Sequence, residues 1–402
     1  MRDSSPPGSP VDDRPPVRTT GAQLTRIGLL LSLVVLVLGS LLFARYDWTG
    51  IPLSRSPERD VKVVSDSCTE IIEPYTTESG RVVGPVVVDE MQYMALVKYY
   101  RGTPRADLQV VCLYDPFTFR SGTSWIAHWL PFEEGVSLSL VNLSGTLLAL
   151  WFLLLTLRAL GHRPRVVLAC GALFAVSWNV LFFGAAILVD ATVVALVALG
   201  AYLLALRRPW LLCPILLLGY PIKETVGILV PVVLVWAFQE YRAGRRTLVA
   251  AAAPAVTAAV CFVVGVAFWR GALPAPDAAW PVTPNLSSLG WNMGNPFGLL
   301  ALLLGAAPYV VLAFLGYRVR ARAEGWFAGL VDWAVVGVVI ALGINFWAFI
   351  TVKTSPRLFW IGIPFCLVLA ARWLAEGRAA DRLGSLRLPA ALVGPPEPEP
   401  AG

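Results

Sequence analysis

The sequence predicts an all-α polytopic membrane protein with about ten transmembrane helices and a large extracytoplasmic first loop. Hydrophobic residues make up 57% of the 402 positions, above the roughly 45–50% of an ordinary soluble domain, and the mean hydropathy is +0.67. Apolar runs long enough to cross a bilayer recur along the chain, separated by short arginine-rich links. The net charge of +6 therefore indicates membrane topology rather than a nucleic-acid surface, because the arginines gather in these links.

The two ends of the chain are predicted to be disordered cytoplasmic tails. Residues 1–26 are polar and rich in proline, and residues 376–402 end in GPPEPEPAG. Neither segment can bury enough apolar surface to offset the entropy lost on ordering. The first apolar run, residues 27–44, is about long enough to span a bilayer. No small-residue cleavage site follows it, so we expect a retained anchor that opens a membrane domain over residues 27–375.

Eight further apolar segments follow the first loop, which covers residues 45–135. They are residues 136–157, 166–184, 186–206, 211–238, 248–269, 296–316, 331–351 and 358–374. Arginine clusters occupy the links, and the excess of Lys and Arg in cytoplasmic links predicts that all of these clusters face the cytoplasm. The clusters are Arg14, Arg18 and Arg26; Arg158, Arg163 and Arg165; Arg207 and Arg208; Arg242, Arg245 and Arg246; Arg318, Arg320 and Arg322; and Arg372, Arg378 and Arg382.

Segment 211–238 carries arginine clusters at both of its ends, which face the same side only if the segment enters the membrane and turns back. It is long for one helix, and Pro221 beside Lys223 and Glu224 supplies a break in its middle. We therefore expect two short helices, a re-entrant-like pair hinged at YPIKE, where protein or a water-filled cavity surrounds the backbone. This brings the count to ten helices with both termini in the cytoplasm.

The same alternation of sides between successive helices places a group of charged residues together on the extracytoplasmic side, beneath the first loop. They are Asp89, Glu90, Asp190, Lys223, Glu224, Lys353 and Arg357. Charged side chains at the edge of a membrane are costly unless they are paired or solvated, so we expect them to share a polar cavity. Carboxylates beside such a cavity are candidates for a general base that takes the proton of a hydroxyl. Lysine and arginine beside them are candidates for a phosphate clamp.

The loop segment VVVDEMQYMALVKYYRG, residues 86–102, predicts a helix that begins at its acidic pair. Asp89 followed by Gln92 fits a helix N-cap with its capping-box partner. An apolar stripe at helical spacing would dock this helix on the membrane. The stripe is Tyr93, Leu96, Val97 and Tyr100. The capping and catalytic roles are compatible, because a capped and docked helix would hold Asp89 or Glu90 rigidly.

The other candidates also have a purely structural interpretation, which the sequence leaves open. Lys223 and Glu224 can be a mutually neutralised pair at the hinge, and Asp190 can cap the helix that follows it. Arg357 can anchor its helix at the lipid headgroups. Arg120, in YDPFTFRSGTSWIAHWLP, can neutralise lipid headgroups beside an aromatic interfacial helix.

Two of the six cysteines, Cys68 and Cys112, lie in the first loop and can form a disulfide there if that loop faces an oxidising side. The sequence does not establish their geometry. The other four lie inside apolar runs, as small core residues do. No metal site and no other cofactor is predicted, since the two histidines are far apart and no acidic triplet is present.

The order of these motifs along residues 27–375 resembles the GT-C superfamily of integral-membrane glycosyltransferases. The motifs are VDEMQYMALVKYYRG, DPFTFRSGTSWIAHWLP, LVDATVVALVALGAYLLALRR, YPIKETVGILVP and TSPRLFWIGIPFCLVLAARWL. Members of this superfamily use polyprenyl-phosphate-linked sugars as donors and act on the outer face of the membrane.

The resemblance implies roles for individual residues. Asp89 or Glu90 matches the catalytic acidic position of the loop, and Asp190 matches a second acidic position. A further set matches the charged positions that line the lipid-phosphate site. These are Lys223, Glu224 and Arg357, with Lys353 and Arg120 grouped beside them. The resemblance also implies an inverting transfer through an oxocarbenium-like state, in which the lipid phosphate leaves and a carboxylate deprotonates the acceptor hydroxyl.

The expected function is therefore transfer of a hexose or pentose from a polyprenyl-phosphate donor to a glycan, lipid or protein acceptor of the cell envelope. Two alternatives are a lipid or solute transporter and a noncatalytic membrane assembly subunit. A transporter predicts internal repeats or helices broken at matching places in two halves, and the sequence has one such break. An assembly subunit would tolerate the loss of Asp89 and Glu90.

Overall fold

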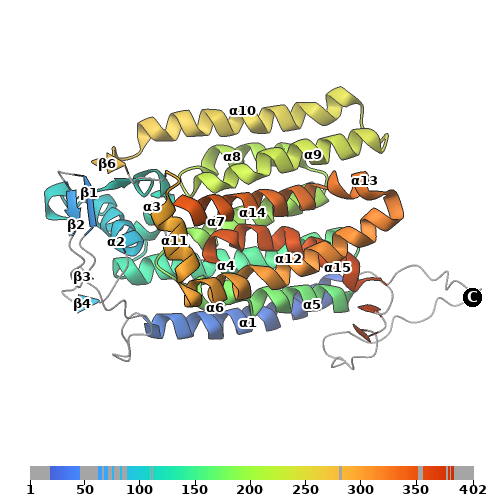
Figure 1. Ribbon diagram of the computed structural model, residues 1–402, viewed down its shortest axis with the longest axis horizontal. Helices are drawn as coiled ribbons and strands as arrows, with labels where there is room; N and C mark the ends of the chain where they lie inside the picture. The colour runs from blue at the N-terminus through green and yellow to red at the C-terminus, as the bar shows by residue number, and fades with distance from the viewer. Residues whose placement is uncertain are drawn as a thin grey trace, which may run out of the picture.

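The computed structural model of the protein is a bundle of helices that lie side by side along one long axis (Figure 1). It describes residues 19–45, 62–65, 68–70, 75–76, 82–83, 88–108, 110, 112–279, 283–351, 356–376, 379–380 and 382–383. Within these ranges, 7 helices are long and apolar enough to cross a membrane. The chain is therefore an all-α, multi-pass membrane protein, as the sequence predicts.

The apolar segments of the sequence form the bundle helices, and segment 211–238 forms two of them. The long helices are α1 (Gly21–Arg45), α4 (Glu134–Ala159), η4 with α9 (Glu224–Ile228 and Leu229–Arg242), α10 (Leu248–Ala272), α12 (Pro296–Glu324), α14 (Trp333–Thr351) and η5 with α15 (Pro356–Gly362 and Ile363–Leu374). The shorter apolar helices are α5 (Pro164–Ala175), α7 (Asp190–Ala205) and η3 with α8 (Pro209–Leu211 and Leu212–Gly219). Helix α1 begins within the segment expected to be a disordered tail, and most of both tails lies outside the described residues.

The centre of the bundle is built by helices whose backbones approach closely. Helix α4 packs along α7, and α12 packs along α15. A Cβ atom on Gly145 of α4 would lie 3.0 Å from the backbone of Ala191 and Thr192, and one on Gly316 of α12 would overlap the carbonyl oxygen of Leu369. Glycine at these positions lets the helices pack backbone to backbone, which is how helices associate in a medium as apolar as their side chains.

The two ends of the bundle differ in composition. One end holds the arginine clusters of the described links between helices, and we call it the arginine end. There Thr19, before α1, donates a hydrogen bond to the carbonyl oxygen of His162 (2.8 Å), in the link between α4 and α5. The other end, at the left of Figure 1, carries the helices α2 and α3 that lie between α1 and α4 in the chain. We call it the site end.

The hinge predicted at YPIKE is present. Helix α8 ends at Gly219, residues 220–223 turn, and η4 begins at Glu224. At the far end of this segment, Arg246 donates to the carbonyl oxygen of Arg207 (3.2 Å). The chain therefore reverses direction at this turn, because the residues before α8 and after α9 lie together at the arginine end while the turn lies at the site end. We call this segment the α8–α9 hairpin, and both of its helices pack on α10.

The segment between α1 and α4 forms a layer over the site end. It contains α2 (Val88–Tyr100), η1 (Arg105–Asp107), β5 (Tyr114–Asp115), η2 (Thr118–Arg120) and α3 (Gly122–His128). Strand β5 pairs in parallel with β6 (Ala278–Ala279), which follows α10. Two short hairpins precede α2: β1 (Lys62–Ser65) with β2 (Cys68–Glu70), and β3 (Tyr75–Thr76) with β4 (Val82–Val83). The remaining short helices are α6 (Trp178–Phe183), α11 (Leu286–Gly294) and α13 (Trp326–Leu330).

The prediction that α2 docks on the membrane through its apolar stripe is wrong. Tyr93, Leu96 and Val97 are at most 2% exposed and belong to a hydrophobic core that α2 shares with α3, α4 and the link before α7. The stripe therefore faces protein. The two most exposed aromatic side chains described in this layer are Trp125 of α3, at 51%, and Trp129, the residue after α3, at 70%. These tryptophans fit the aromatic interfacial helix expected around Arg120.

The cysteine predictions are met in part. Cys112 is disulfide-bonded, and the four cysteines in the apolar helices are free. The side chain of Cys68 lies outside the described residues, so its pairing with Cys112 stays a prediction. Lys353 also lies outside them.

The α8–α9 hairpin predicts a labelling pattern in intact cells. In a protein whose four free cysteines are replaced by alanine, single cysteines at Arg208 and Ala243 should respond alike to a membrane-impermeant thiol reagent, since both lie at the arginine end. A cysteine at Gly271, exposed at the far end of α10, should respond in the opposite way. Opposite responses at Arg208 and Ala243 would rule out the hairpin.

Candidate functional site

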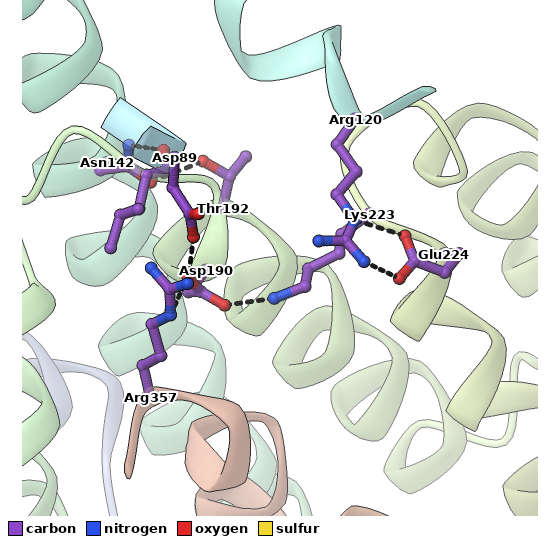
Figure 2. Close-up of polar contacts among 9 residues, drawn as sticks. Asp89, Arg120, Asn142, Asp190, Thr192, Lys223, Glu224 and Arg357 are labelled. Atoms are coloured by element: carbon purple, nitrogen blue, oxygen red, sulfur yellow. Dashed lines mark hydrogen bonds and ion pairs between the residues drawn. The ribbon is translucent and has the colours of Figure 1, made fainter. Parts of the chain in front are cut away.

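The candidate site lies at the site end, where α2, the start of α7, the hinge turn and η5 meet (Figure 2). These elements come from four separate parts of the chain. Each brings a charged side chain to the same place, and together the side chains form a series in which the signs of charge alternate.

The innermost part of this series is a buried ion pair. Lys223 in the hinge turn donates a hydrogen bond from Nζ to Oδ1 of Asp190, the first residue of α7. Asp190 is 3% and Lys223 is 4% exposed. The amide of Gly122 holds the turn in place, because it donates a hydrogen bond to the carbonyl oxygen of Pro221 (2.7 Å). The hinge thus places its lysine against α7, where an isolated charge would be strongly unfavourable.

Arg357 of η5 extends the series outward. Its Nε lies 3.9 Å from Oδ2 of Asp190, and its NH2 group donates to Oδ2 of Asp89 in α2. The side chains of Arg357 and Asp89 are 21% and 28% exposed. We call the four residues the charge chain: Asp89, Arg357, Asp190 and Lys223. Two carboxylates and two cations give it no net charge, and Asp89 is its most exposed carboxylate.

A second ion pair lies beside the charge chain. Arg120 of η2 donates to Glu224 of η4 through Nε (2.8 Å to Oε2) and NH2 (to Oε1), in a two-pronged arrangement. Burial by itself would lower the pKa of Arg120, but the Glu224 carboxylate outweighs it and raises that pKa above its ordinary value. The guanidinium is therefore permanently charged, and it joins the layer of α2 and α3 to the hinge.

Tyr93 also belongs to the site, although the sequence analysis assigned this residue only to an apolar stripe. Arg120 and three members of the charge chain, Asp89, Asp190 and Arg357, act on the pKa of its side chain. Burial raises the pKa of its phenol well above the ordinary value, so the hydroxyl stays neutral at pH 7. No pattern in the sequence separates this tyrosine from its apolar neighbours, because its role depends on what packs against α2.

Asn142 of α4 positions the start of α7. Its Nδ2 donates to the carbonyl oxygens of Leu138 (3.1 Å) and Leu188, and its Oδ1 accepts from the hydroxyl of Thr192 (3.3 Å). Asn142 is 1% exposed. These bonds hold the link before α7 and its first turn against α4, and thereby set the place of Asp190. The sequence analysis missed this residue, although an asparagine inside an apolar helix is a signal that could have identified it.

Several structural interpretations of the predicted residues are wrong. Lys223 and Glu224 do not neutralise each other, since each pairs with another element. Asp190 is not a helix cap, because α7 begins at this residue and its N-cap is Val189. The guanidinium groups of Arg357 and Arg120 pair with the carboxylates of Asp89 and Glu224.

The capping-box interpretation of α2 is also wrong. Gln92 donates from Nε2 to the carbonyl oxygen of Cys112 (2.8 Å), and its Oε1 accepts from the amide of Tyr114 (3.3 Å). The side chain of Asp89 binds Arg357. Gln92 therefore ties α2 to the strand β5, and the carboxylate of Asp89 is used for the site. Glu90, the alternative acidic candidate, is buried with 3% exposure.

No family model matches the chain, and comparisons with curated proteins and with solved structures find no match. Fold and site define an all-α, multi-pass membrane protein with a network of ion pairs at one end.

The Asp190–Lys223 pair predicts a large loss of stability when it is broken on one side. Lys223→Met should reduce the free energy of unfolding by about 3–5 kcal/mol, because it leaves a buried carboxylate without its closest cation. Adding Asp190→Asn should restore much of this loss. Titration with SDS measures both effects.

The matched control is an exposed ion pair of the same end. Arg105 and Asp277 are 41% and 39% exposed at their side chains and lie 2.8 Å apart. Arg105→Gln should reduce the free energy of unfolding by no more than about 1 kcal/mol. A loss at Lys223 as small as this would show that the buried pair does not hold the hinge to α7.

Proposed function

We propose that the protein is a membrane glycosyltransferase that moves a sugar from a polyprenyl-phosphate donor to a hydroxyl of a cell-envelope acceptor. The observation that carries the proposal is the Asp89–Arg357 contact, which holds a partly exposed carboxylate beside a guanidinium at one end of a membrane bundle. A transferase of this kind needs a base for the acceptor and a cation for the departing phosphate. The resemblance of the sequence motifs to the GT-C superfamily supports the same assignment.

The orientation follows from the arginine clusters. Seven long and three shorter apolar helices make ten crossings in this proposal, and the excess of arginine at one end assigns that end to the cytoplasm. The site then faces the extracytoplasmic side, with both chain termini in the cytoplasm. The tryptophans of α3, at the same end as the site, lie at the outer interface of the membrane in this orientation.

In the proposed reaction, the carboxylate of Asp89 takes the proton of the acceptor hydroxyl. The acceptor oxygen attacks the anomeric carbon, the bond from that carbon to the phosphate oxygen breaks, and the electron pair leaves with the lipid phosphate. Attack opposite the leaving group inverts the anomeric configuration. The proton ends on Asp89 and passes to water after the product leaves.

Arg357 has two tasks in this scheme. Its contact with Asp89 orients the carboxylate before the acceptor arrives. Its guanidinium also stabilises the charge that develops on the leaving phosphate, since it presents several N–H donors in a plane. Asp190 and Lys223 are positioning residues: they hold Arg357 from the buried side. Each cation of the charge chain is already paired with a carboxylate. A donor phosphate that binds Arg357 must therefore share it with Asp89.

The proposal is tested by mass spectrometry of envelope glycans and polyprenyl-phosphate sugars in cells with and without the protein. Cells that lack it should lose one glycan modification and accumulate its lipid-linked donor. Asp89→Asn keeps the shape of the side chain and removes the base, so transfer should fall by about 10²–10⁴-fold with an unchanged protein level. Asp107→Asn, an exposed carboxylate of the same layer, should restore transfer fully.

Three results would contradict the proposal in different ways. Full transfer with Asp89→Asn would remove the catalytic assignment of that residue. Loss of transfer with Glu90→Gln at a normal protein level would move the base to the neighbouring position. Identical glycan and lipid profiles with and without the protein would favour a transporter or an assembly subunit instead.

A further inference from the structure

A second polar site lies at the arginine end, opposite the charge chain. It is a cavity of about 780 Å³, lined by residues of α4, α7, α9, α12, α13 and α14. Its charged lining residues are Arg207, Arg242, Arg245, Arg320, Glu240 and Glu324. Four arginines against two glutamates leave a net lining charge of +2, so the cavity favours an anion.

Most of these charges are already engaged with one another. Glu240, with 5% of its side chain exposed, accepts from NH2 of Arg245 (2.7 Å) and lies 3.9 Å from Nε of Arg207. Arg320 pairs with Glu324 (3.1 Å) and with the fully buried Asp332. These pairs fix the walls of the cavity and set the direction of the arginines around it.

Arg242 differs from the other arginines of the cavity. Within the described part of the chain, no carboxylate forms an ion pair with it. Its guanidinium lies 5.9 Å from the ring centre of Phe238 and 5.9 Å from that of Phe327. Two aromatic contacts thus hold the side chain in place and leave its N–H donors and its charge for a ligand.

The surroundings of the cavity are those of a membrane interface. Leu160, Leu204 and Trp236 provide apolar parts of its lining. Large apolar side chains around this end of the bundle are exposed, among them Trp326 at 68% and Phe327 at 52%. A tryptophan beside arginines is typical of the level at which lipid headgroups lie. A ligand bound in this cavity therefore meets cations at one side and apolar surface at the other.

We propose that this cavity binds the phosphate of an anionic phospholipid, with Arg242 as the principal contact. A guanidinium can donate two parallel hydrogen bonds to phosphate oxygens. Arg207 and Arg245, 57% and 44% exposed at their side chains, line the same space and add to its positive potential. The apolar part of the lining and the exposed aromatic side chains receive the acyl chains. A soluble phosphate ester shares the headgroup chemistry but makes no use of this apolar surface.

The test is lipid binding by native mass spectrometry of the purified full-length protein. Phosphatidylglycerol should bind, and phosphatidylcholine, which carries no net charge, should bind much more weakly. Arg242→Gln should weaken phosphatidylglycerol binding about tenfold, the effect of removing one charged hydrogen-bonding group. Arg242→Lys should retain most of the binding. The matched control is Arg322→Gln, since Arg322 is an exposed arginine of α12 that does not line the cavity.

Defined outcomes overturn the proposal. Unchanged binding in Arg242→Gln would remove the cavity as the site, and an equal loss in Arg322→Gln would show a general effect of surface charge. Competition by glycerol 3-phosphate as strong as that of phosphatidylglycerol would overturn the assignment to a lipid. None of these measurements uses the charge chain, so their failure leaves the proposed transferase function unaffected.

Discussion

The structure depends on charge neutralisation at the site end of an apolar bundle. A buried carboxylate or ammonium without a partner destabilises a protein by several kcal/mol, and water is scarce between membrane helices. Asp190 and Lys223 satisfy each other there, and Arg357 joins them to Asp89 outside. The start of α7, the hinge turn, η5 and α2 must therefore keep fixed relative positions, although they are far apart in the sequence.

The same requirement governs the arginine end, where its result is different. Asp332 is completely buried and pairs with Arg320 and Arg372, which ties α12 and α15 to the start of α14. Glu240 pairs with Arg207 and Arg245 and closes the α8–α9 hairpin. Arginine is in excess over carboxylate at this end. The charge chain is balanced, while the arginine end keeps positive charge available to the membrane surface.

Much of the fold was predictable, because hydrophobic length and the arginine links constrain a membrane chain strongly. The hinge at Pro221 followed from two arginine clusters that had to face one side, and the convergence of Asp190, Lys223 and Arg357 followed from the same count. The partners were not predictable. Lys223 pairs across the bundle with Asp190 rather than with its neighbour Glu224, because the direction of a side chain in a turn depends on tertiary packing.

The layer over the site shows the same limit. The spacing of Tyr93, Leu96 and Val97 correctly indicated a helix, but residues 90–98 are all buried. An apolar stripe does not say whether protein or lipid covers it. The position of Gln92 matched a capping box, yet its amide binds the backbone at Cys112 and Tyr114. Local patterns predicted the helix, and only long-range contacts decided its role.

The central claim is that the charge chain behaves as one unit, so that its two ends depend on each other through Arg357 and Asp190. A double-mutant cycle with Asp89→Asn and Lys223→Met measures this dependence as a free energy of unfolding. Residues that share a network are coupled, whereas distant independent residues are additive to within roughly 0.3–0.5 kcal/mol. We predict a coupling free energy clearly above about 0.5 kcal/mol. Additive effects would contradict this claim and show that the Asp89–Arg357 and Asp190–Lys223 ion pairs are independent of each other.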